Sequence, residues 1–566
     1  MSLSLKSHIC GLLQQAVRTI APAAAAPVVL QRPKLAQHGD YACNIALQLA
    51  KQLGRNPLEV AAQLVQALPE SPFIARKEVA GAGFLNLFLT PAAKRRVIAE
   101  IHAAGQQYGE SKLGLGQRVL VEFVSANPTG PLHVGHGRGA AYGASLANVL
   151  AAAGFSVWRE YYVNDAGRQM DILALSTWLR YLERFSGGAA FPANCYQGDY
   201  VKAMAQEIYR LHGERYRRDP QPLTLDAPDP EAEPEAHLDH LIARAKQLLG
   251  QDYRYIHDFA LNEQLGDCRH DLLEFGVAFD AWFSEQSRFD SGMVERVLCL
   301  LEKQEHVYVQ DGAKWFRASR FGDEKDRVVQ RENGEYTYFA SDIAYHYNKI
   351  ERGFDRAIDV WGADHHGYVP RIKGVLSALG LDAGKLEVAL VQFAVLYRDG
   401  KKIPMSTRAG EFVTLRELRG EVGNDAARFF YVLRKSDQHL DFDLDLAKSE
   451  TSDNPVYYIQ YAHARVCSVI AQWGGDPNSL LEIDTEPLEG AREMTLLERL
   501  RDYPEVIENA ARELSPHLIA FYLRDLAAEF HSYYNATRIL VDDERLKLAR
   551  LSLAVAVRQV IRNGLT

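Results

Sequence analysis

The sequence predicts an α/β protein of several domains, with a parallel sheet at its centre. Between residues 119 and 162 a strand, a loop rich in proline and glycine, a helix and a second strand follow one another, which is the order of a βαβ unit. A similar alternation returns between residues 336 and 395. The 566 residues have room for about three to five domains, so further domains are expected around this core.

The composition excludes several classes of protein. Hydrophobic residues make up 47% of the chain and charged residues 24%, as in ordinary globular proteins. The apolar stretch at residues 19–30 contains two prolines and is shorter than the ~20 residues of a membrane-spanning helix, so neither a membrane segment nor a signal peptide is expected. Six scattered cysteines without a two-residue spacing argue against structural zinc and disulfides, and favour the cytoplasm.

The first domain, residues 1–95, is predicted to be α+β. Helical periodicity runs through residues 3–20, 41–53 and 58–68, and the alternating residues 81–89 predict a strand. Residues 1–120 carry 13 Lys and Arg against 6 Asp and Glu, whereas the whole chain has a net charge of −9. This basic surface is equally compatible with binding phosphates and with simple solvation.

The core is predicted in two halves, residues 96–180 and 331–400. In the first half, 119–124 and 155–162 are predicted strands and 138–153 a helix; the second half contains predicted strands at 336–340 and 356–361 around a helix at 342–352. Residues 181–330, which include an acidic, proline-rich segment, are predicted to be a connective insertion. Residues 401–454 are predicted to form a mobile loop and linker, and 455–566 an all-α helical bundle.

His133 and His136 flank Gly135 at the start of the first predicted helix of the core. Free N–H groups at a helix N-terminus attract anions, and glycine permits a close approach, so two imidazoles there can donate to phosphates. The spacing alone also fits metal binding or a structural role. The strand–loop–helix context and the absence of an adjacent third ligand favour phosphate binding.

The string SANPTGPLHVGHGRG at residues 125–139 resembles the ATP-binding motif of class I aminoacyl-tRNA synthetases, and that of arginyl-tRNA synthetases in particular. Residues 38–51 and 83–89 are similar to the N-terminal domain of that family, and residues 423–448 and 454–465 to its approach to the anticodon-binding domain. The resemblance extends over nearly the whole chain.

This resemblance implies a Rossmann-like catalytic core and ATP-dependent ligation of L-arginine to tRNA(Arg) through arginyl-adenylate, which releases AMP and pyrophosphate. It implies ATP with Mg²⁺ as the nucleotide substrate, a monomer in the cytoplasm, and no partnership with DNA or a membrane.

The resemblance also assigns residues to roles. The catalytic residues would be His133, His136, Lys402 and Arg408. ATP would contact Pro128, Gly135, Gly362, Asp364, Met405 and Ser406. Arginine would contact Ser125, Asn127, Tyr338, Asp342 and His365. The tRNA would contact Phe84 and Asn86 in the first domain, and Tyr461 and Arg465 in the last. From the residues alone, Tyr338 and Phe84 could instead be core aromatics, and Asp342 a helix N-cap.

One loop departs from the family pattern. Class I enzymes usually carry a Lys-Met-Ser-Lys-Ser loop whose second lysine contacts the phosphates, whereas residues 404–408 read Pro-Met-Ser-Thr-Arg. Neither lysine is present, so Arg408 or the upstream Lys401 and Lys402 would have to supply the cation. Arginine is not a neutral replacement, because its planar fork differs from a compact ammonium.

Three other functions remain as alternatives. A small-molecule nucleotidylyltransferase would share the histidine loop but would not need the first and last domains. A catalytically silent tRNA-binding protein would have lost the lysine loop. A metal-dependent hydrolase would use His133, His136 and His365 as ligands.

Overall fold

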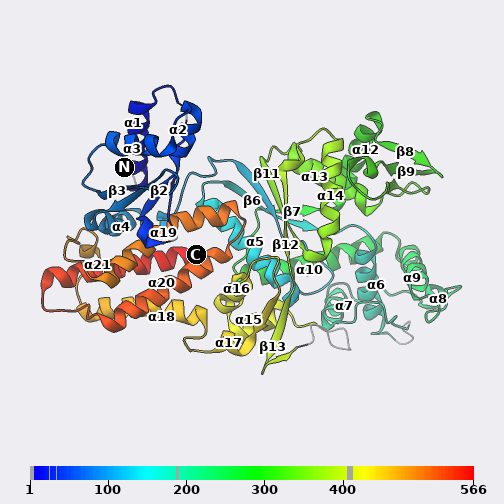
Figure 1. Cartoon of the computed structure of the whole chain (residues 1–566). Helices are drawn as coiled ribbons and strands as arrows, with labels where there is room; N and C mark the ends of the chain where they lie inside the picture. Colours follow the sequence, from blue (N-terminus) through cyan, green and yellow to red (C-terminus); the bar gives the residue numbers. More distant parts are fainter. Residues whose placement is uncertain (1–4, 25, 34, 186–189, 404–411) are drawn as a thin grey trace. The chain divides into compact units, whose positions relative to one another are not determined.

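The computed structural model describes residues 5–24, 26–33, 35–185, 190–403 and 412–566. These residues form two compact units (Figure 1). Unit 1 comprises Met1–Glu110, Tyr457–Val506 and Phe521–Thr566, and unit 2 comprises Ser111–Val456 and Ile507–Ala520. The α/β core therefore lies in unit 2, and both ends of the chain belong to unit 1.

Unit 2 is built on a five-stranded sheet in which every neighbouring pair is parallel. Its strands are β5 (Arg118–Glu122), β6 (Ser156–Val163), β7 (Ala281–Ser284), β11 (Arg356–Gly362) and β12 (Leu386–Val391). The spatial order is β12-β11-β5-β6-β7, so the chain reverses its direction of travel across the sheet between β5 and β11. The predicted parallel-sheet core is confirmed.

Close packing fixes helix α5 (Val134–Ala152), which connects β5 to β6. A Cβ atom at Gly143 would lie 2.3 Å from the ring of Phe123, and one at Gly137 would lie 2.8 Å from Tyr431 on α16 (Asn424–Val432). Only glycine permits these approaches. They hold the N-terminus of α5 directly beyond the carboxyl end of β5.

Two sequence predictions are wrong in detail. Residues 336–340 were expected to form a strand, but Thr337 is the N-cap of helix α13 (Tyr338–Glu351), and its hydroxyl accepts a hydrogen bond from Ala340 N. Aromatic and β-branched residues favour strands only weakly, and tertiary packing overrides that preference. Residues 41–53 were expected to be helical throughout, but β2 (Tyr41–Cys43) pairs with β4 before α2 (Ile45–Leu53) begins.

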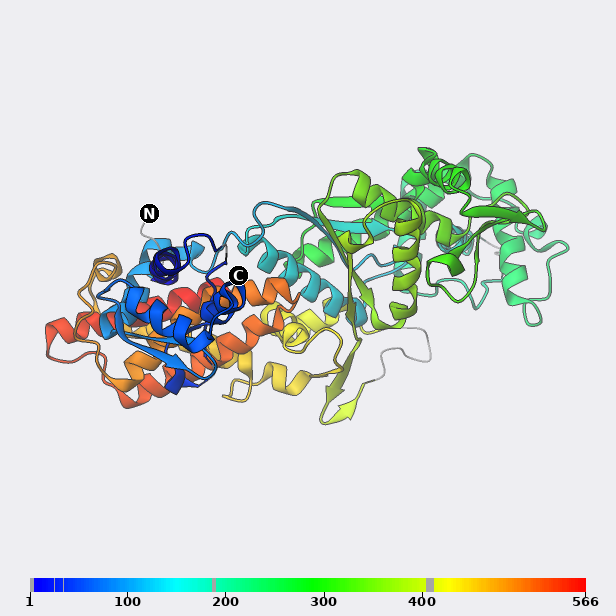
Figure 2. The ribbon, with the colours of Figure 1, turned by 45° about the horizontal axis from the view of Figure 1, so that its top comes forward.

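The region between β6 and α13 is mostly helical. Its helices are α6 (Arg168–Leu182), α7 (Asp199–His212), α8 (Gln221–Thr224), α9 (Pro234–Leu249), α10 (Asp252–Glu274), α11 (Gln286–Asp290) and α12 (Met293–Lys303). An antiparallel sheet follows, formed by β8 (Val307–Gln310), β9 (Ala313–Phe316) and β10 (Arg327–Gln330). Figure 2 shows these elements, coloured teal to green, at one end of unit 2. β7 lies within the predicted insertion yet joins the main sheet. The sequence did not reveal this strand, because four residues are too few for a visible alternation of apolar and polar side chains.

The remaining elements of unit 2 follow β11. They are α14 (Val369–Ala378), β13 (Ala394–Arg398), β14 (Lys401–Lys402), α15 (Leu415–Val422), α16, β15 (Leu440–Asp443) and α17 (Leu444–Lys448). β13 pairs with β14 in an antiparallel hairpin and with β15 in parallel. Short 3-10 helices in the described chain are Ala36–His38, Gly105–Gln107, Ala318–Phe321, Ala363–Tyr368, Ala383–Lys385 and Pro477–Leu480.

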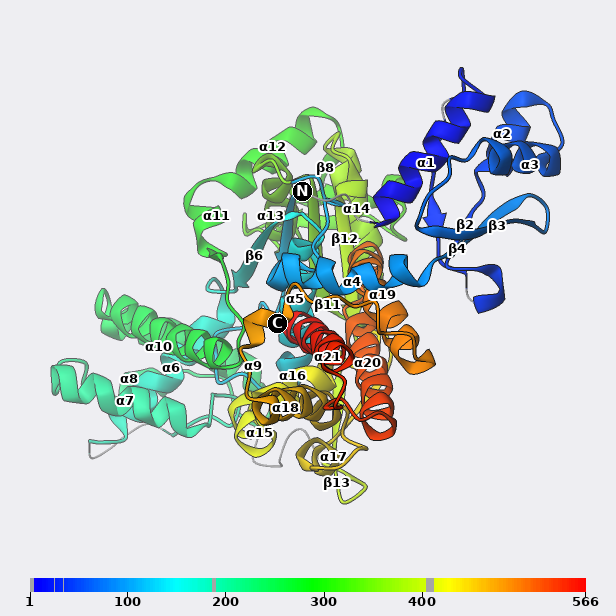
Figure 3. The ribbon, with the colours of Figure 1, turned by 90° about the vertical axis from the view of Figure 1, so that its left-hand side faces the viewer.

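Unit 1 combines an α+β part with a helical part, as predicted. The first contains α1 (Leu5–Ile20), α2, α3 (Pro57–Ala67), α4 (Pro91–Ala104) and the sheet β1-β2-β4-β3, with β1 (Leu30–Gln31), β3 (Ile74–Ala80) and β4 (Phe84–Leu89). The helical part contains most of α18 (Pro455–Trp473), α19 (Ala491–Arg512) and α20 (His517–Ala536), and all of α21 (Glu544–Leu565). Helices α18, α20 and α21 lie side by side in Figures 1 and 3. Within the described ranges, none of the helices combines the length and the hydropathy that crossing a membrane requires.

Candidate active site

The loops that follow β5 and β11 leave the same edge of the sheet, at the place where the strand order reverses. Open α/β sheets bind their ligands at this kind of position, beyond the carboxyl ends of the strands. The loop after β5 carries Ser125, Asn127, Pro128, His133, Gly135 and His136, and the loop after β11 carries Gly362, Asp364 and His365. The structure therefore brings residues predicted to bind ATP and arginine to one place, although they are more than 200 positions apart.

His133 and His136 cap the first turn of α5. His133 Nδ1 accepts a hydrogen bond from Gly135 N at 3.1 Å, and His136 Nδ1 accepts one from His133 N at 3.3 Å. The two rings stack with their centroids 3.7 Å apart. Because each Nδ1 is an acceptor, each neutral ring carries its proton on Nε2.

Burial keeps both imidazoles uncharged. It lowers the pKa of His133, and together with the neighbouring His133 it lowers the pKa of His136 to about 3. In the described part of the chain neither Nε2 has a hydrogen-bond partner. Near pH 7 the helix terminus therefore offers two free Nε2–H donors to an anion.

The segment after residue 411 is anchored to these histidines. Val134 N donates to Val413 O at 3.0 Å, and Leu415 N donates to Leu132 O at 2.8 Å. Thr414 then caps α15 in a reciprocal pair of hydrogen bonds with Glu417. The segment that follows the loop with the unusual Pro-Met-Ser-Thr-Arg sequence is therefore fixed beside the predicted phosphate-binding residues.

The loop itself contains three of the predicted site residues. Met405, Ser406 and Arg408 lie outside the described residues. Lys402 lies in β14, where it pairs with Tyr397 and is exposed to solvent.

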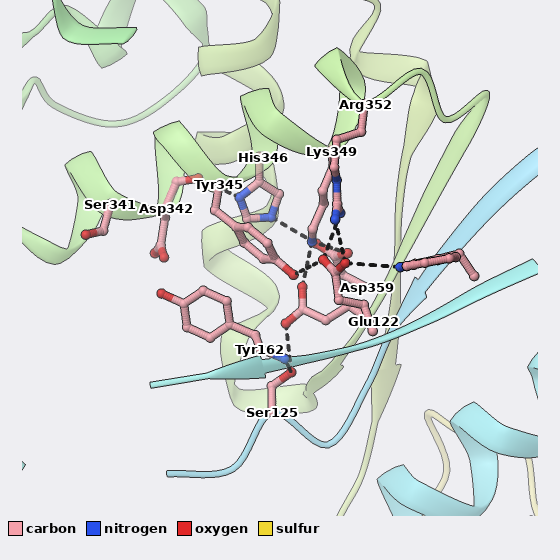
Figure 4. Close-up of polar contacts among 12 residues, drawn as sticks. Glu122, Ser125, Tyr162, Ser341, Asp342, Tyr345, His346, Lys349, Arg352 and Asp359 are labelled. Carbon is pink, nitrogen blue, oxygen red and sulfur yellow. Dashed lines mark hydrogen bonds and ion pairs between the residues drawn. The ribbon is translucent and has the colours of Figure 1, made fainter. Parts of the chain in front are cut away.

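Ser125 occupies an unusual backbone conformation at the end of β5. Val124 and Ser125 have φ angles of 68° and 43°, which is costly for a β-branched residue such as valine. Ser125 Oγ donates to Glu122 Oε1 at 2.9 Å and accepts from Tyr162 N at 3.1 Å (Figure 4). These contacts hold the strained loop in place.

Asp342 lies on the first turns of α13, and its side chain points toward the hydroxyl of Tyr162 (Figure 4). Its Oδ2 accepts a hydrogen bond from Tyr368 OH at 2.6 Å, and Oδ1 has no partner among the described residues. The N-cap is Thr337, so the alternative that Asp342 caps the helix is wrong. Tyr338 is 66% exposed, which excludes the core-aromatic alternative for that residue.

Glu285 and Arg288 belong to this region and were not predicted from the sequence. Glu285 follows β7, and its side chain is 5% exposed. Oε1 pairs with Arg288 at 2.9 Å, and the buried Oε2 has no partner in the described chain. Burial raises the pKa of Glu285 to about 6, against the opposing charge of Arg288.

Arg288 connects Glu285 to the surroundings of Asp342. It is fully buried and donates to the hydroxyl of Tyr162 and to the carbonyl of Ser341, the residue before Asp342. One Glu and one Arg three positions apart occur on many surface helices, so the sequence contained no signal for this pair.

A buried ionic network involves two further residues of the helix that carries Asp342. Lys349 Nζ contacts Glu122 Oε2 and Asp359 Oδ1, each at 2.6 Å, and His346 Nε2 lies 2.9 Å from Asp359 Oδ2 (Figure 4). The paired Lys349 lowers the pKa of Asp359 although its burial alone would raise it. The network ties α13 to β5 and β11, and thus positions Asp342 relative to Ser125.

Lys349→Met should therefore destabilise unit 2. The variant leaves the carboxylates of Glu122 and Asp359 buried without their cation, and breaking such a pair costs about 3–5 kcal/mol. Urea unfolding of both proteins measures the difference. Lys303→Met, at an exposed position on α12, serves as the control and should cost less than about 0.5 kcal/mol. A loss below about 1 kcal/mol for Lys349→Met would contradict this view of the network.

The loop after β11 is the most open part of the site. Asp364 and His365 are 62% and 61% exposed, and His365 Nε2 lies 3.5 Å from Asp364 Oδ2. A Cβ atom at Gly362 would lie 2.4 Å from Asp364 Oδ1, so glycine leaves room for this turn. Over the described ranges, no group of three or more His, Cys, Asp or Glu side chains is arranged to hold a metal ion.

Comparisons with known proteins cover the whole chain. The model of the arginyl-tRNA synthetase N-terminal domain matches residues 6–89, that of the class I (R) tRNA synthetase catalytic domain matches 97–186 and 267–446, and that of the DALR anticodon-binding domain matches 459–566. An arginine–tRNA ligase of Nitrosospira multiformis is 65% identical over 561 residues, which are 99% of this chain and 97% of that protein. The chain belongs to the arginyl-tRNA synthetases.

Two further arginyl-tRNA synthetases resemble this chain, one in sequence and one in fold. The arginine–tRNA ligase of Azoarcus sp. is 64% identical over an alignment that covers 100% of this chain and 98% of that protein. The structure of the Thermus thermophilus arginyl-tRNA synthetase has the same fold, with a TM-score of 0.72 at 23% identity over 99% of this chain and 98% of that one. The predicted family and the class I fold are confirmed. The family also confirms the predicted function, ATP-dependent ligation of arginine to tRNA in translation.

The predicted tRNA contacts of this synthetase lie in unit 1. Phe84 on β4 is 38% exposed, whereas Asn86 on the same strand is only 3% exposed. On α18, Tyr461 is 41% exposed and packs against Arg465, whose guanidinium lies 4.6 Å from the Tyr461 ring centre. Arg465 also binds Asn535 Oδ1 at 3.0 Å. Three of the four side chains are thus at least partly exposed, while Asn86 is enclosed in this structure.

Proposed function

We propose that this synthetase activates L-arginine at the carboxyl ends of β5 and β11 and then transfers it to tRNA(Arg). In the first step the arginine carboxylate attacks the α-phosphorus of ATP, so that an acyl–phosphate bond forms and pyrophosphate leaves. In the second step a terminal ribose hydroxyl of the tRNA attacks the carbonyl carbon and AMP leaves.

One observation supports this proposal above the others: two neutral imidazoles present free Nε2–H donors at the N-terminus of α5. Phosphoryl-type transfer depends on positioned donors that stabilise developing charge, and little covalent chemistry is required of the protein. His133 and His136 would bind the phosphates, with Pro128 and Gly135 allowing ATP to approach the backbone.

The guanidinium of the arginine substrate would bind the carboxylates of Asp342 and Glu285. Asp342 Oδ1 and Glu285 Oε2 are carboxylate oxygens without a partner in the described chain, and oxygen pairs match the planar donors of a guanidinium. The exposed ring of Tyr338 would cover the side chain, while Ser125, Asn127 and His365 would face the α-amino and carboxylate groups.

We include Mg²⁺ in this proposal as the ion that accompanies ATP. It would be held largely by phosphate oxygens and water, as is usual for nucleotide-bound Mg²⁺. The proposal also includes a monomer that works in the cytoplasm, where translation uses arginyl-tRNA, without DNA or membrane partners.

Exchange of pyrophosphate into ATP tests the activity directly. The assay is run with arginine and with a panel of the other amino acids, each with and without tRNA(Arg). We expect exchange with arginine alone among the amino acids. No exchange under any condition would instead favour a protein that binds tRNA without catalysis.

The same assay identifies the cation that replaces the missing lysines. We expect Arg408→Ala to lower kcat more than Lys401→Ala, because Arg408 stands within the loop and Lys401 precedes it. Losing one phosphate-directed donor should cost about 10²-fold. The opposite order of the two variants would assign the role to the β14 lysines, with Lys402→Ala as the next variant to measure.

A further inference from the structure

One part of unit 2 lies outside the catalytic family model. That model matches residues 97–186 and 267–446 and leaves residues 187–266 unmatched. Helices α7 and α9 of this region pack with α6 and α10 around a core of their own, which includes Trp178, Tyr181, Ile208 and Leu241. The region is therefore a folded body joined to the catalytic core.

A side chain of this body reaches the loop that carries the predicted nucleotide-binding residues. The hydroxyl of Tyr200, in the first turn of α7, donates a hydrogen bond to Thr129 O at 2.7 Å. A Cβ atom at Gly130 would lie 3.1 Å from the same hydroxyl. Tyr200 thus lies directly against the segment between Pro128 and His133.

Packing aims the ring of Tyr200 at this loop. A Cβ atom at Gly198, the N-cap of α7, would lie 2.4 Å from the ring. The ring also packs against an apolar cluster formed by Met170, Leu173, Val201, Met204 and Ala260. Burial raises the pKa of Tyr200, so its hydroxyl remains a donor at physiological pH.

The loop needs such support. It begins with two residues in the left-handed region, Val124 and Ser125, and a strained backbone persists only where its surroundings fix it. On the side of β6, Tyr161 OH donates to Ala126 O at 2.9 Å. On the other side, Thr129 O is held by Tyr200. Two tyrosines from different elements therefore bind successive parts of the loop.

We propose that Tyr200 is a positioning residue for ATP: its hydroxyl holds the Thr129 carbonyl and thereby sets the distance between the loop and the bound nucleotide. The proposal rests on the ATP-binding role proposed above for this loop. Small displacements of positioning groups reduce binding and rate, because supporting contacts set the geometry of a site. The region 187–266 would thus contribute to the reaction without touching the substrates.

Tyr200→Phe removes only the hydroxyl and tests this role. In arginine-dependent pyrophosphate exchange we expect the KM for ATP to rise about three- to tenfold, the range of one lost hydrogen bond, with the KM for arginine within about twofold of wild type. The matched control is Tyr253→Phe. Tyr253 lies in the first turn of α10 and packs in the core of the same body, and its hydroxyl donates to Asp171 Oδ1 at 2.7 Å.

Thermal unfolding of both variants separates positioning from stability. A merely structural role would lower the Tm of both variants and leave the KM for ATP unchanged. Equal KM values for ATP in Tyr200→Phe and Tyr253→Phe would overturn the proposal. Exchange by the wild-type protein would at the same time leave the proposed function intact. Absence of exchange in the wild-type protein would overturn both.

Discussion

Asp342→Ala should abolish the use of arginine while the enzyme still binds ATP. The variant removes the carboxylate whose Oδ1, within the described ranges, has no partner and can accept from a guanidinium. Truncating one partner of an enclosed charge pair costs about 2–5 kcal/mol, which corresponds to a loss of about 30- to 5,000-fold in kcat/KM for arginine. The KM for ATP should change little, because the histidines lie on a different element.

A conservative series makes this result specific. Asp342→Asn keeps the shape and removes the charge, and Tyr368→Phe keeps the carboxylate but removes the hydroxyl that donates to Oδ2. We expect the KM for arginine to rise in the order Tyr368→Phe, Asp342→Asn, Asp342→Ala. Asp355→Ala is the control, since this exposed carboxylate binds Arg118 N at the amino end of β11. Unchanged arginine kinetics in Asp342→Ala would contradict the assignment of Asp342 to the arginine site.

Local patterns predicted the parts of the site that lie close together in the sequence. The apolar run at 119–124, the loop and the glycine between two histidines predicted the arrangement of β5 and α5. The strand at 356–361 predicted where the second loop begins. Both predictions depend on hydrophobic periodicity and turn residues, and these signals describe only interactions between residues a few positions apart in the sequence.

The residues that the sequence did not reveal act through long-range contacts. Glu285 reaches the site only because β7 pairs with β6. Lys349 forms its ion pairs only because α13, β5 and β11 come together around its ammonium group. Tyr200 reaches a loop 71 positions away. A single titratable or aromatic residue carries no periodic signal, so only the fold reveals such partners. The arginine-site prediction for Asp342 came from family resemblance, since an aspartate at the start of a predicted helix could equally have been its N-cap.

His136→Ala should slow activation without weakening arginine binding. The variant removes an Nε2–H donor at the N-terminus of α5, and the loss of one donor to developing charge typically costs about 10²- to 10³-fold in kcat. Titration calorimetry should give the wild-type affinity for arginine, because Asp342 and Glu285 are untouched. The exchange assay with saturating arginine measures kcat.

The pKa of His136 makes a second expectation possible. Because burial lowers it from 6.5 to about 3, the ring is neutral throughout the range from pH 6 to pH 8 and donates through Nε2–H at each pH. The ratio of wild-type to His136→Ala rates should therefore stay constant over that range. A ratio that grows as the pH falls toward 6 would mean that the charged imidazolium is the active form. His270→Ala, an exposed histidine paired with Glu274 on α10, should match wild type and controls for the general loss of an imidazole.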